Sequence, residues 1–230
     1  MIQKKIYYYG GFIILQSGKI PLKNIYWTMI TIIDNISGNF LSVLNMIKKI
    51  GYIVELTNNY DKISKSKILI LPGVGAFDKV MNYIYENKID KAILNAIEEN
   101  SKFLGICVGM QVLFEKSEEG KLDGLNLIKG EVVKFRTSEN KYKIPHMGWN
   151  TVNFSEDNNF NKSLKKNRFY FVHSFYAVCH DKKNILGTTN YISNFTSAVK
   201  KNNIYGVQFH PEKSHYFGKS FLKSFIENWC

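Results

Sequence analysis

The segment FLGICVGMQ, Phe103 to Gln111, combines the features of a cysteine nucleophile. An apolar run ends at Cys107, with Gly105 and Gly109 two residues to either side. This spacing is typical of a nucleophile elbow, where a strand turns sharply into a helix and a flanking side chain would clash. The turn would place the sulfur at the carboxyl edge of a sheet and at a helix N-terminus, which favours the thiolate. A structural cysteine at a tight turn is the alternative interpretation.

His210, in GVQFHPEKS, has the setting of a base for that thiol. An apolar run precedes it, Pro211 fixes the following turn, and Glu212 lies two residues on. A carboxylate there can accept one imidazole N–H and leave the other ring nitrogen facing the sulfur. A surface histidine beside an acid is the plainer interpretation of His-Pro-Glu alone. Its combination with the Cys107 elbow favours a Cys107–His210–Glu212 triad.

The segment LPGVGAF, Leu71 to Phe77, could supply donors for an oxyanion. It follows an apolar run, and the backbone N–H groups of Gly73, Val74 and Gly75 could face a ligand. The N–H of Val108, directly after the nucleophile, would supply another donor. An ordinary glycine-rich turn between a strand and a helix is the alternative.

Alternating patterns from Met29 onward predict how these residues are positioned. Strand-like and helix-like runs alternate as far as Gly120, which predicts an α/β fold with an open, mostly parallel sheet and flanking helices. After Gly120, short strand-like runs predict an antiparallel elaboration, including a hairpin around Lys201 to Asn203, and an amphipathic helix near Phe217 to Trp229. In the first half, the expected strands are 30–33, 52–56, 67–71 and a run ending at residue 107, and the expected helices are 39–49, segments of 78–100 and about 108–116.

Composition narrows the class of protein. The 230 residues, 45% apolar, suffice for one domain with a substantial core. The net charge of +12 comes almost entirely from dispersed lysines, with Arg136 and Arg168 the only arginines, so we expect a solvated surface and no nucleic-acid partner. The three cysteines are too few for a disulfide framework and indicate a reducing compartment, the cytoplasm. No Cys or His spacing resembles a metal site, and no cofactor is expected.

Residues 1–28 are expected to be a poorly specified extension before a domain at 29–230. The apolar run near the N-terminus is broken by Gly10 and Gly11, is too short to span a bilayer, and precedes no cleavage-like site. We therefore expect no membrane segment. The alternative is that Ile13 to Leu15 adds an edge strand or covers a partner surface.

Five segments in order resemble the motifs of the class I (triad) glutamine amidotransferases. The resemblance is greatest to the glutaminase subunits of imidazole glycerol phosphate synthase, and it runs from Met29 to the C-terminus. The segments are LPGVGAF, LGICVGMQ, IPHMGWN, YFVHSFY and QFHPEKS. HMGWN and FVHSFY separate this subunit from the anthranilate, carbamoyl-phosphate and GMP synthase relatives.

The resemblance implies that Cys107 attacks the side-chain amide of L-glutamine, giving a thioester and ammonia, and that water then releases glutamate. His210 would move the protons and Glu212 would orient His210. Gln111 would bind the substrate, and 73–75 would form an oxyanion strand that is flexible until the partner binds. The residues implied to hold the ends of the substrate through backbone groups are His173, Ser174 and Phe175.

The resemblance also implies a partner, a (β/α)₈-barrel cyclase that receives the ammonia in a heterodimer. The residues implied to lie toward it are Gly38, Asn39, Trp149 and Lys213. The turn DNISGN departs from the family pattern, because Ile36 stands where glycine is usual. Two alternatives stay open: a paralogue that supplies ammonia for amidation or amidination of a surface sugar, and a non-catalytic binding subunit with the same fold.

Overall fold

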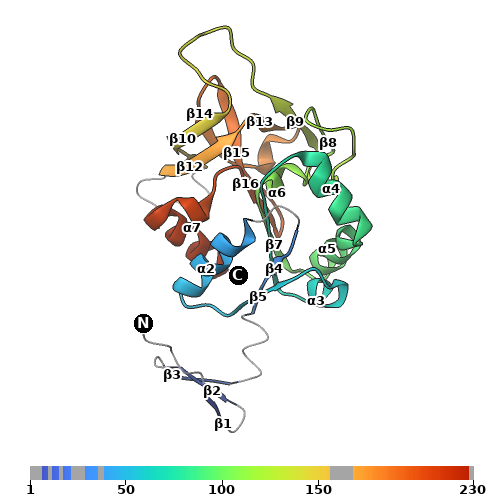
Figure 1. Ribbon diagram of the computed structural model, residues 1–230, viewed down its shortest axis with the longest axis vertical. Coiled ribbons are helices and arrows are strands. Elements are labelled where there is room, and N and C mark those ends of the chain that lie inside the picture. The colour runs from blue at the N-terminus through green and yellow to red at the C-terminus, as the bar shows by residue number, and fades with distance from the viewer. Residues whose placement is uncertain are drawn as a thin grey trace.

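The computed structural model describes residues 29–35, 39–155 and 168–227, together with the backbone of three short strands nearer the N-terminus. Its core is one large mixed sheet with helices on both sides (Figure 1). The sheet follows the order β5-β4-β6-β7-β16-β15-β13-β9-β8, and β14 joins it beside β15. The predicted α/β fold, a mostly parallel sheet with an antiparallel elaboration, is confirmed.

The first half of the sheet is parallel and places Cys107 at its carboxyl edge. Pairing is parallel from β5 through β4, β6 and β7 to β16. Every residue of β4, β6 and β7 is buried, as expected for strands covered on both faces. The bounds of these strands are β4 Ile30–Ile33, β5 Val54–Thr57, β6 Ile68–Gly73, β7 Lys102–Cys107 and β16 Ile204–Val207.

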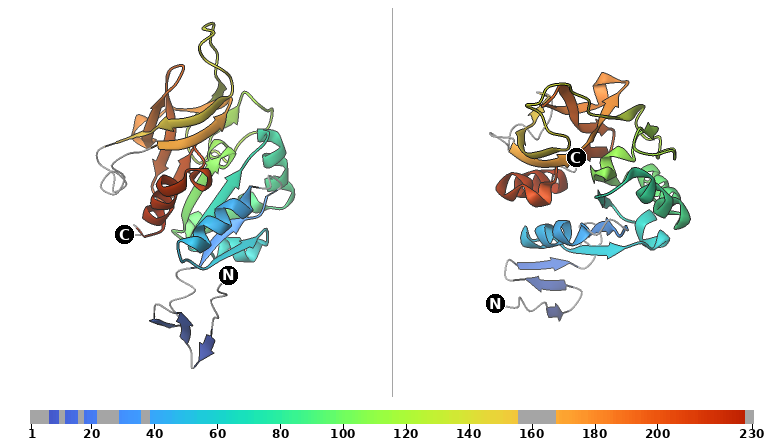
Figure 2. Two further views of the ribbon diagram at one scale, coloured as in Figure 1. Left: turned by 60° about the vertical axis from the view of Figure 1, so that its left-hand side comes forward. Right: turned by 45° about the horizontal axis from the view of Figure 1, so that its top comes forward.

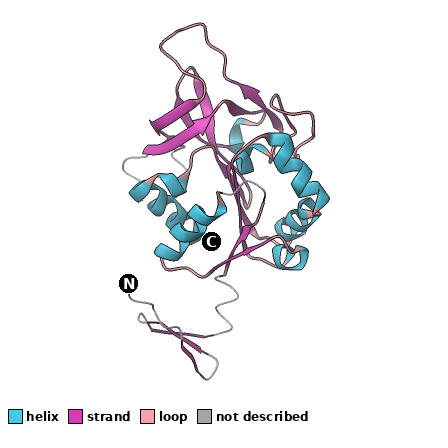
Figure 3. Cartoon of the chain, viewed as in Figure 1, coloured by secondary structure: helices cyan, strands magenta, loops and turns pink. Residues whose placement is uncertain are grey.

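Helices cover both faces of the parallel strands. α2 and α7 lie on one side of the sheet, and α3, α4 and α5 lie on the other (Figure 3). The longer helices turn apolar residues such as Val43, Val80 and Ile93 into the core, as their periodic spacing predicts. The bounds of the helices are α2 Phe40–Lys49, α3 Tyr60–Ser64, α4 Phe77–Glu86, α5 Ile89–Glu98 and α7 His215–Glu227.

The second half of the chain is mainly antiparallel. The predicted hairpin is confirmed, because β15 and β16 pair antiparallel on either side of 202–203. A separate two-stranded sheet, β10 with β12, sets His146 opposite His173. The bounds are β8 Lys116–Ser117, β9 Gly130–Lys134, β10 His146–Thr151, β11 Asn153–Phe154, β12 Arg168–His173, β13 Phe175–Cys179, η1 Lys182–Asn184, β14 Ile185–Asn190, β15 Asn194–Lys201 and η2 Pro211–Lys213.

The helix after Cys107 is much shorter than the sequence predicts. α6 spans Val108–Gln111, whereas the expected helix continued to about residue 116. The Val112 carbonyl accepts from the Leu125 N–H of a returning loop, and the Glu115 N–H donates to the Gly130 carbonyl, so neither group is available for the helical bonds of residues 115 and 116. Gly124 permits this approach, since a Cβ there would lie 2.1 Å from the Phe114 oxygen. The prediction was wrong because a tertiary contact ends the helix.

Three strands near the N-terminus form a sheet of their own. β1 (Tyr7–Tyr9), β2 (Phe12–Leu15) and β3 (Gly18–Pro21) pair antiparallel with one another. They lie at the opposite end of the molecule from β10 and β12 in both views of Figure 2. In the described part of the chain, β2 therefore does not extend the edge of the main sheet. No described helix is long and apolar enough to cross a membrane.

Candidate active site

Cys107 occupies the sharp turn between β7 and α6. Its φ and ψ of 56° and −111° lie outside the regions that side-chain-bearing residues normally adopt. Such strain is typical of functional sites, where surrounding packing fixes the backbone. The packing here is tight, and the Cys107 side chain is 4% exposed. The turn sets the thiol at the start of α6 and level with Gly73, its register partner on β6.

The two flanking glycines are required by close backbone contacts. A Cβ on Gly105 would lie 2.1 Å from the carbonyl oxygen of Gly109. A Cβ on Gly109 would lie 1.9 Å from the carbonyl oxygen of Leu71. Real Cβ atoms do not approach this closely, so neither position accepts a side chain without a backbone shift. The glycine spacing thus lets α6 pack directly on β7 and β6.

His210 and Glu212 form a buried pair beside the thiol. His210 Nδ1 lies 2.7 Å from Glu212 Oε1, and both side chains are fully removed from solvent. His210 Nε2 has no hydrogen-bond partner among the described residues. Burial lowers the pKa of His210, but the charges of Cys107 and Glu212 outweigh it and raise the pKa to about 10. The imidazole is therefore stabilised as a cation.

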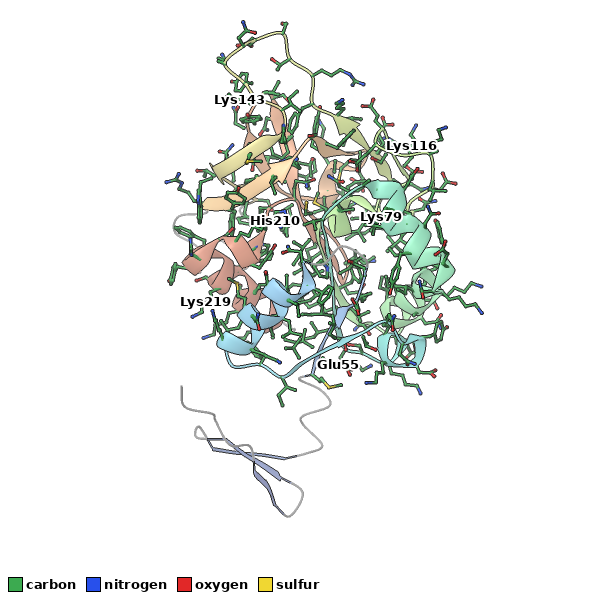
Figure 4. All side chains as sticks on the ribbon, in the orientation of Figure 1. Glu55, Lys79, Lys116, Lys143, His210 and Lys219 are labelled. Atoms are coloured by element: carbon green, nitrogen blue, oxygen red, sulfur yellow. The ribbon has the colours of Figure 1, made fainter. Side chains whose placement is uncertain are left out.

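Asn39 connects the start of α2 to this pair. Its side-chain amide donates a short hydrogen bond to the same Oε1 of Glu212. The Glu212 oxygen that orients His210 is thus itself held by a second element. Figure 4 labels His210 near the middle of the molecule, whereas Lys116 and Lys219 are labelled toward its two sides.

Gln111 and Gln208 extend the network on the other side of the sulfur. Gln208 Nε2 lies 3.6 Å from Cys107 Sγ, within reach of an N–H···S hydrogen bond. Gln208 Oε1 accepts from Gln111 Nε2 at 3.1 Å, and Gln111 Nε2 also donates to the Phe175 carbonyl at 3.2 Å. Both N–H bonds of the Gln111 amide are engaged, so its carbonyl oxygen is the group left to meet a ligand.

Two buried histidines support the Phe175 carbonyl. His173 Nδ1 lies 2.8 Å from the Phe175 oxygen, and His173 Nε2 lies 3.0 Å from His146 Nδ1. Burial lowers the pKa of His173 to about 3 and that of His146 to about 4, so both rings are neutral near pH 7. The Ser174 carbonyl is also engaged, by the N–H of Phe135 at 2.9 Å.

A cavity of about 590 Å³ opens in front of Cys107. This is large enough for an amino acid. Glu119 is the carboxylate that lines it, and burial raises the pKa of this group. Glu119 Oε2 accepts a hydrogen bond from the Phe77 N–H at 2.9 Å and thereby caps the N-terminus of α4. The lining residues are Asn39, Val74, Gly75, Ala76, Cys107, Val108, Gln111, Glu119, Pro145, Val172, His173, Ser174, Phe175 and Lys213.

The segment 73–75 forms one wall of the cavity. Gly75 has a φ of 109°, a conformation that favours glycine, and no atom lies within 4 Å of a Cβ built on it. Gly75 and Ala76 are exposed, whereas Gly73 is buried against α6. The wall is therefore anchored at Gly73 and open at Gly75.

An exposed patch on and beside β10 lies near the mouth of the cavity. The patch consists of Ile144, Met147 and Trp149, which are 37%, 62% and 39% exposed. The Trp149 ring stacks on His215, with centroids 5.7 Å apart and planes at 10°. Lys213, which lines the cavity, lies over the Tyr170 ring, and that ring meets Trp149 edge-on. Gly38 and Ile36 lie outside the described residues.

The structure places Cys107, Gln111, His210, Glu212 and the segments 73–75 and 173–175 close together, and it adds three residues to them. Gln208, Glu119 and His146 were not among the candidates. Gln208 lies two residues before His210, a spacing that puts two side chains on one face of an extended segment, so alternation was the available signal. Glu119 and His146 reach the site through loop and cross-strand contacts, for which the sequence offers no local signal. Within the described residues, no cluster of His, Cys, Asp and Glu could hold a metal ion.

Comparisons with known proteins agree with this geometry. Residues 31–229 match the model of the family "Glutamine amidotransferase class-I". The chain is 54% identical over 201 residues to "Imidazole glycerol phosphate synthase subunit HisH 2" of Methanococcus maripaludis, covering 86% of this chain and 99% of the relative. It is 42% identical over 202 residues to "Imidazole glycerol phosphate synthase subunit HisH" of Leptospira borgpetersenii, covering 86% and 98%.

Solved structures share the fold at much lower identity. The structure of PurLQS from Thermotoga maritima matches with a TM-score of 0.66 and 20% identity, covering 86% of this chain and 97% of that one. A structure titled "Crystal structure of glutamine amidotransferase" matches with a TM-score of 0.67 and 16% identity, again covering 86% and 97%. The family match covers the residues of the site, and the HisH relatives cover 86% of the chain. The chain therefore belongs to the class-I glutamine amidotransferases and, within them, to the HisH family of imidazole glycerol phosphate synthase subunits.

Proposed function

We infer that this chain is the glutaminase subunit of an imidazole glycerol phosphate synthase, with Cys107, His210 and Glu212 as its catalytic triad. The observation that carries the inference is the buried pair of His210 and Glu212 next to the strained turn at Cys107. The second ring nitrogen of His210, Nε2, has no hydrogen-bond partner among the described residues. A base that is oriented by a carboxylate and left free on its other nitrogen is the arrangement that thiol catalysis requires.

The proposed reaction proceeds through a thioester. Cys107 Sγ attacks the side-chain carbonyl carbon of L-glutamine, and the negative charge collects on the carbonyl oxygen. Collapse of this intermediate breaks the C–N bond, and His210 gives its proton to the leaving nitrogen, which departs as ammonia. His210 then takes a proton from water, which attacks the thioester and releases glutamate and the Cys107 thiol.

The oxyanion would be held by backbone N–H groups. Val108 at the start of α6, and Val74 and Gly75 on the opposite segment, line the cavity, and their N–H groups are the candidate donors. One such donor contributes roughly 10²–10³ in rate. The positive φ and open surroundings of Gly75 support a segment that can reorient its N–H, so we expect the isolated chain to be a poor glutaminase.

The ends of the substrate would be held by Glu119, Gln111 and the 173–175 backbone. An α-ammonium group needs an acceptor, and the carbonyls of Ser174 and Phe175 are already engaged by protein donors. Glu119, the lining carboxylate, is the group best suited to the ammonium. This leaves backbone N–H groups of 173–175 for the α-carboxylate.

The ammonia would pass to a (β/α)₈-barrel cyclase docked at the mouth of the cavity. The exposed patch of Ile144, Met147 and Trp149 supports this placement, because exposed apolar clusters of this kind mark interaction surfaces. Lys213 and Asn39, which line the cavity, would lie on the path between the two sites. The relatives named as subunits of one synthase support a heterodimer.

The test separates ammonia production from its use. The complex with the cyclase of the same organism is assayed with either glutamine or ammonium salt as the nitrogen source. We expect Cys107→Ala to abolish glutamine hydrolysis and to spare ammonia-dependent synthesis, since the cyclase site is intact. Cys179→Ala is the matched control, because Cys179 lies on β13 outside the cavity lining and burial raises its pKa to about 12. Glutaminase activity of Cys107→Ala within tenfold of the unaltered complex would exclude the triad.

A further inference from the structure

The site contains a side chain to which the proposed reaction gives no role. Gln208 follows β16 directly, is fully buried, and has its backbone N–H bonded to the Ser197 carbonyl at 2.9 Å. Its side chain reaches between Cys107 and Gln111, with Nε2 3.6 Å from Cys107 Sγ and Oε1 3.1 Å from Gln111 Nε2. Burying an amide costs free energy unless its hydrogen bonds are made, so a fully buried amide next to the nucleophile needs partners.

The orientation of the Gln208 amide follows from its neighbours. The Phe175 carbonyl can only accept, so the Gln111 nitrogen must point toward it. The same nitrogen then donates its second N–H to Gln208, whose oxygen must face Gln111. The nitrogen of Gln208 consequently faces the sulfur. The amide direction is thus fixed by the hydrogen-bond pattern and not by shape, which a flipped amide would satisfy equally.

A buried chain of hydrogen bonds holds this arrangement from the far side. Since the Phe175 carbonyl accepts from His173 Nδ1, the neutral His173 ring must present a lone pair at Nε2. His146 Nδ1 donates to that lone pair, and Asn150 Nδ2 lies 3.3 Å from the remaining nitrogen of His146, to which it donates.

Asn150 is itself fixed from both sides. Its nitrogen also donates to the Asn190 carbonyl at 2.9 Å, and its oxygen accepts from the Thr151 N–H at 2.7 Å. Every member of the chain from β10 to the Phe175 carbonyl therefore has one hydrogen-bonding direction.

We propose that Gln208 is a positioning residue for the nucleophile, donating its amide N–H to Cys107 Sγ and thereby holding the thiolate in line with the substrate carbonyl. The proposal rests on the proposed function, because it assigns a role at the same thiol. A hydrogen bond to an anionic acceptor is stronger than one to a neutral group, so the donor favours the thiolate over the thiol. Its loss leaves the attacking sulfur both less ionised and less ordered.

The effect is separable from other charges near the sulfur. The titratable groups near the sulfur are His210 and Glu212 beside it and Glu119, His173 and Lys213 in the cavity lining. None of them is altered by a substitution at Gln208. Gln208→Met keeps the approximate volume and removes both side-chain hydrogen bonds. Gln208→Glu keeps the acceptor for Gln111 but replaces the donor with a carboxylate facing the sulfur.

The test follows alkylation of Cys107 by iodoacetamide against pH in the full-length chain, with the modified peptide quantified by mass spectrometry. We expect Gln208→Met to lower the alkylation rate at pH 7 about tenfold and to move its pH midpoint upward, and Gln208→Glu to move the midpoint further. In the complex, we expect kcat for glutamine hydrolysis to fall about tenfold in Gln208→Glu while KM stays within twofold, because Gln111 keeps its partner. Ser66→Ala is the matched control, since it removes another buried hydrogen bond of the same sheet, 3.1 Å to the Ile68 carbonyl at the start of β6, without touching Gln208 or its partners.

The outcomes distinguish this proposal from the proposed function. The role of Gln208 would be overturned if both Gln208 variants gave the same alkylation profile against pH as the unaltered chain. A rise in KM without a fall in kcat in Gln208→Glu would also overturn it, because that pattern reports substrate binding. If Gln208→Met does not fold, the same profile is measured for Gln208→Leu, which also removes the donor without adding a charge. A Cys107 that reacts no faster than Cys179 in the unaltered chain at pH 7 would instead contradict the activated thiol, and with it the proposed function.

Discussion

His210 Nδ1 and Glu212 Oε1 lie 2.7 Å apart with both side chains fully buried, although only Pro211 separates the two residues in the chain. The short 3₁₀ turn of η2 brings the carboxylate back onto the imidazole. Because the Asn39 amide binds the same oxygen, the carboxylate has one orientation. The pair therefore fixes the ring so that Nε2 is left for the reaction, and this relationship underlies the predictions below.

Replacing Glu212 with glutamine tests the orienting carboxylate. Glu212→Gln retains the shape but removes a charge that raises the pKa of His210, so we expect this pKa to fall from about 10 toward its ordinary value. We expect kcat for glutamine hydrolysis in the complex to fall roughly 10²–10⁴-fold, the usual contribution of acid–base catalysis. The pKa is measured by NMR titration of the histidines and kcat by glutamate release. A variant with unchanged kcat and an unchanged His210 titration would show that Glu212 does not act on the ring.

Acid should destabilise the fold through His146 and His173. Their folded pKa values of about 4 and 3 lie below the ordinary value of about 6.5, so the unfolded chain binds more protons than the folded chain as the pH falls. Their contribution to the free energy of unfolding is present above pH 6.5 and is lost as the pH falls toward 4. The contribution of His210 has the opposite pH dependence, because its pKa is raised. This contribution stabilises the fold fully below about pH 6.5 and is lost as the pH rises through 10.

The measurement is the thermal midpoint between pH 7 and pH 4.5. We expect His146→Gln to lower the midpoint at pH 7 but to show a shallower fall on acidification than the unaltered chain. His180→Gln serves as control, because His180 is exposed, and should leave the slope unchanged. Parallel slopes for the unaltered chain and His146→Gln would contradict the assignment.

The exposed patch on β10 should carry much of the affinity for the partner. We expect Trp149→Ala to weaken binding of the cyclase by about 2 kcal/mol, as is usual for a tryptophan at the centre of an interface. Calorimetric titration of the chain with the cyclase gives the value. Leu94→Ala is the control, because Leu94 is similarly exposed, at 38%, but lies on α5 at the other face of the sheet. Equal affinities for the two variants would place the interface elsewhere.

We expect a chain that starts at Met29 to retain the fold and its response to the cyclase. The strands β1 to β3 pair with one another and not with the main sheet, which begins at Ile30. Ends of a chain without contacts to the core are usually dispensable. Thermal midpoints and cyclase-stimulated glutaminase rates of the long and short forms are compared. Aggregation of the short form, or a lost response to the cyclase, would show that residues 1–28 contribute to the domain.

The sequence predicted those parts of the molecule that depend on local pattern. The buried strands β4, β6 and β7 are continuous apolar runs, and the glycines around Cys107 mark a turn that only glycine permits. The antiparallel hairpin of β15 and β16 has a turn between two strand-like runs. In each case a few neighbouring residues determine the backbone conformation, so the sequence pattern is sufficient to predict it.

Features that depend on tertiary contacts could not be predicted. α6 ends at Gln111 because the Val112 carbonyl and the Glu115 N–H bind backbone groups of Leu125 and Gly130 in place of helical partners. Glu119 enters the cavity through its bond to the start of α4, and His146 meets His173 only because β10 and β12 pair in this register. The direction of the Gln208 amide follows from a chain of partners on several strands. None of these contacts leaves a periodic trace in the sequence.

The most direct test of the central claim is identification of the covalent intermediate. The complex is mixed with glutamine, quenched in acid during turnover, digested, and analysed by peptide mass spectrometry. A thioester mechanism predicts a γ-glutamyl group on Cys107 in the unaltered complex and its absence in Cys107→Ala. A γ-glutamyl group on another residue, or glutamine hydrolysis by Cys107→Ala at a rate within tenfold of the unaltered complex, would contradict the assignment of Cys107 as the nucleophile.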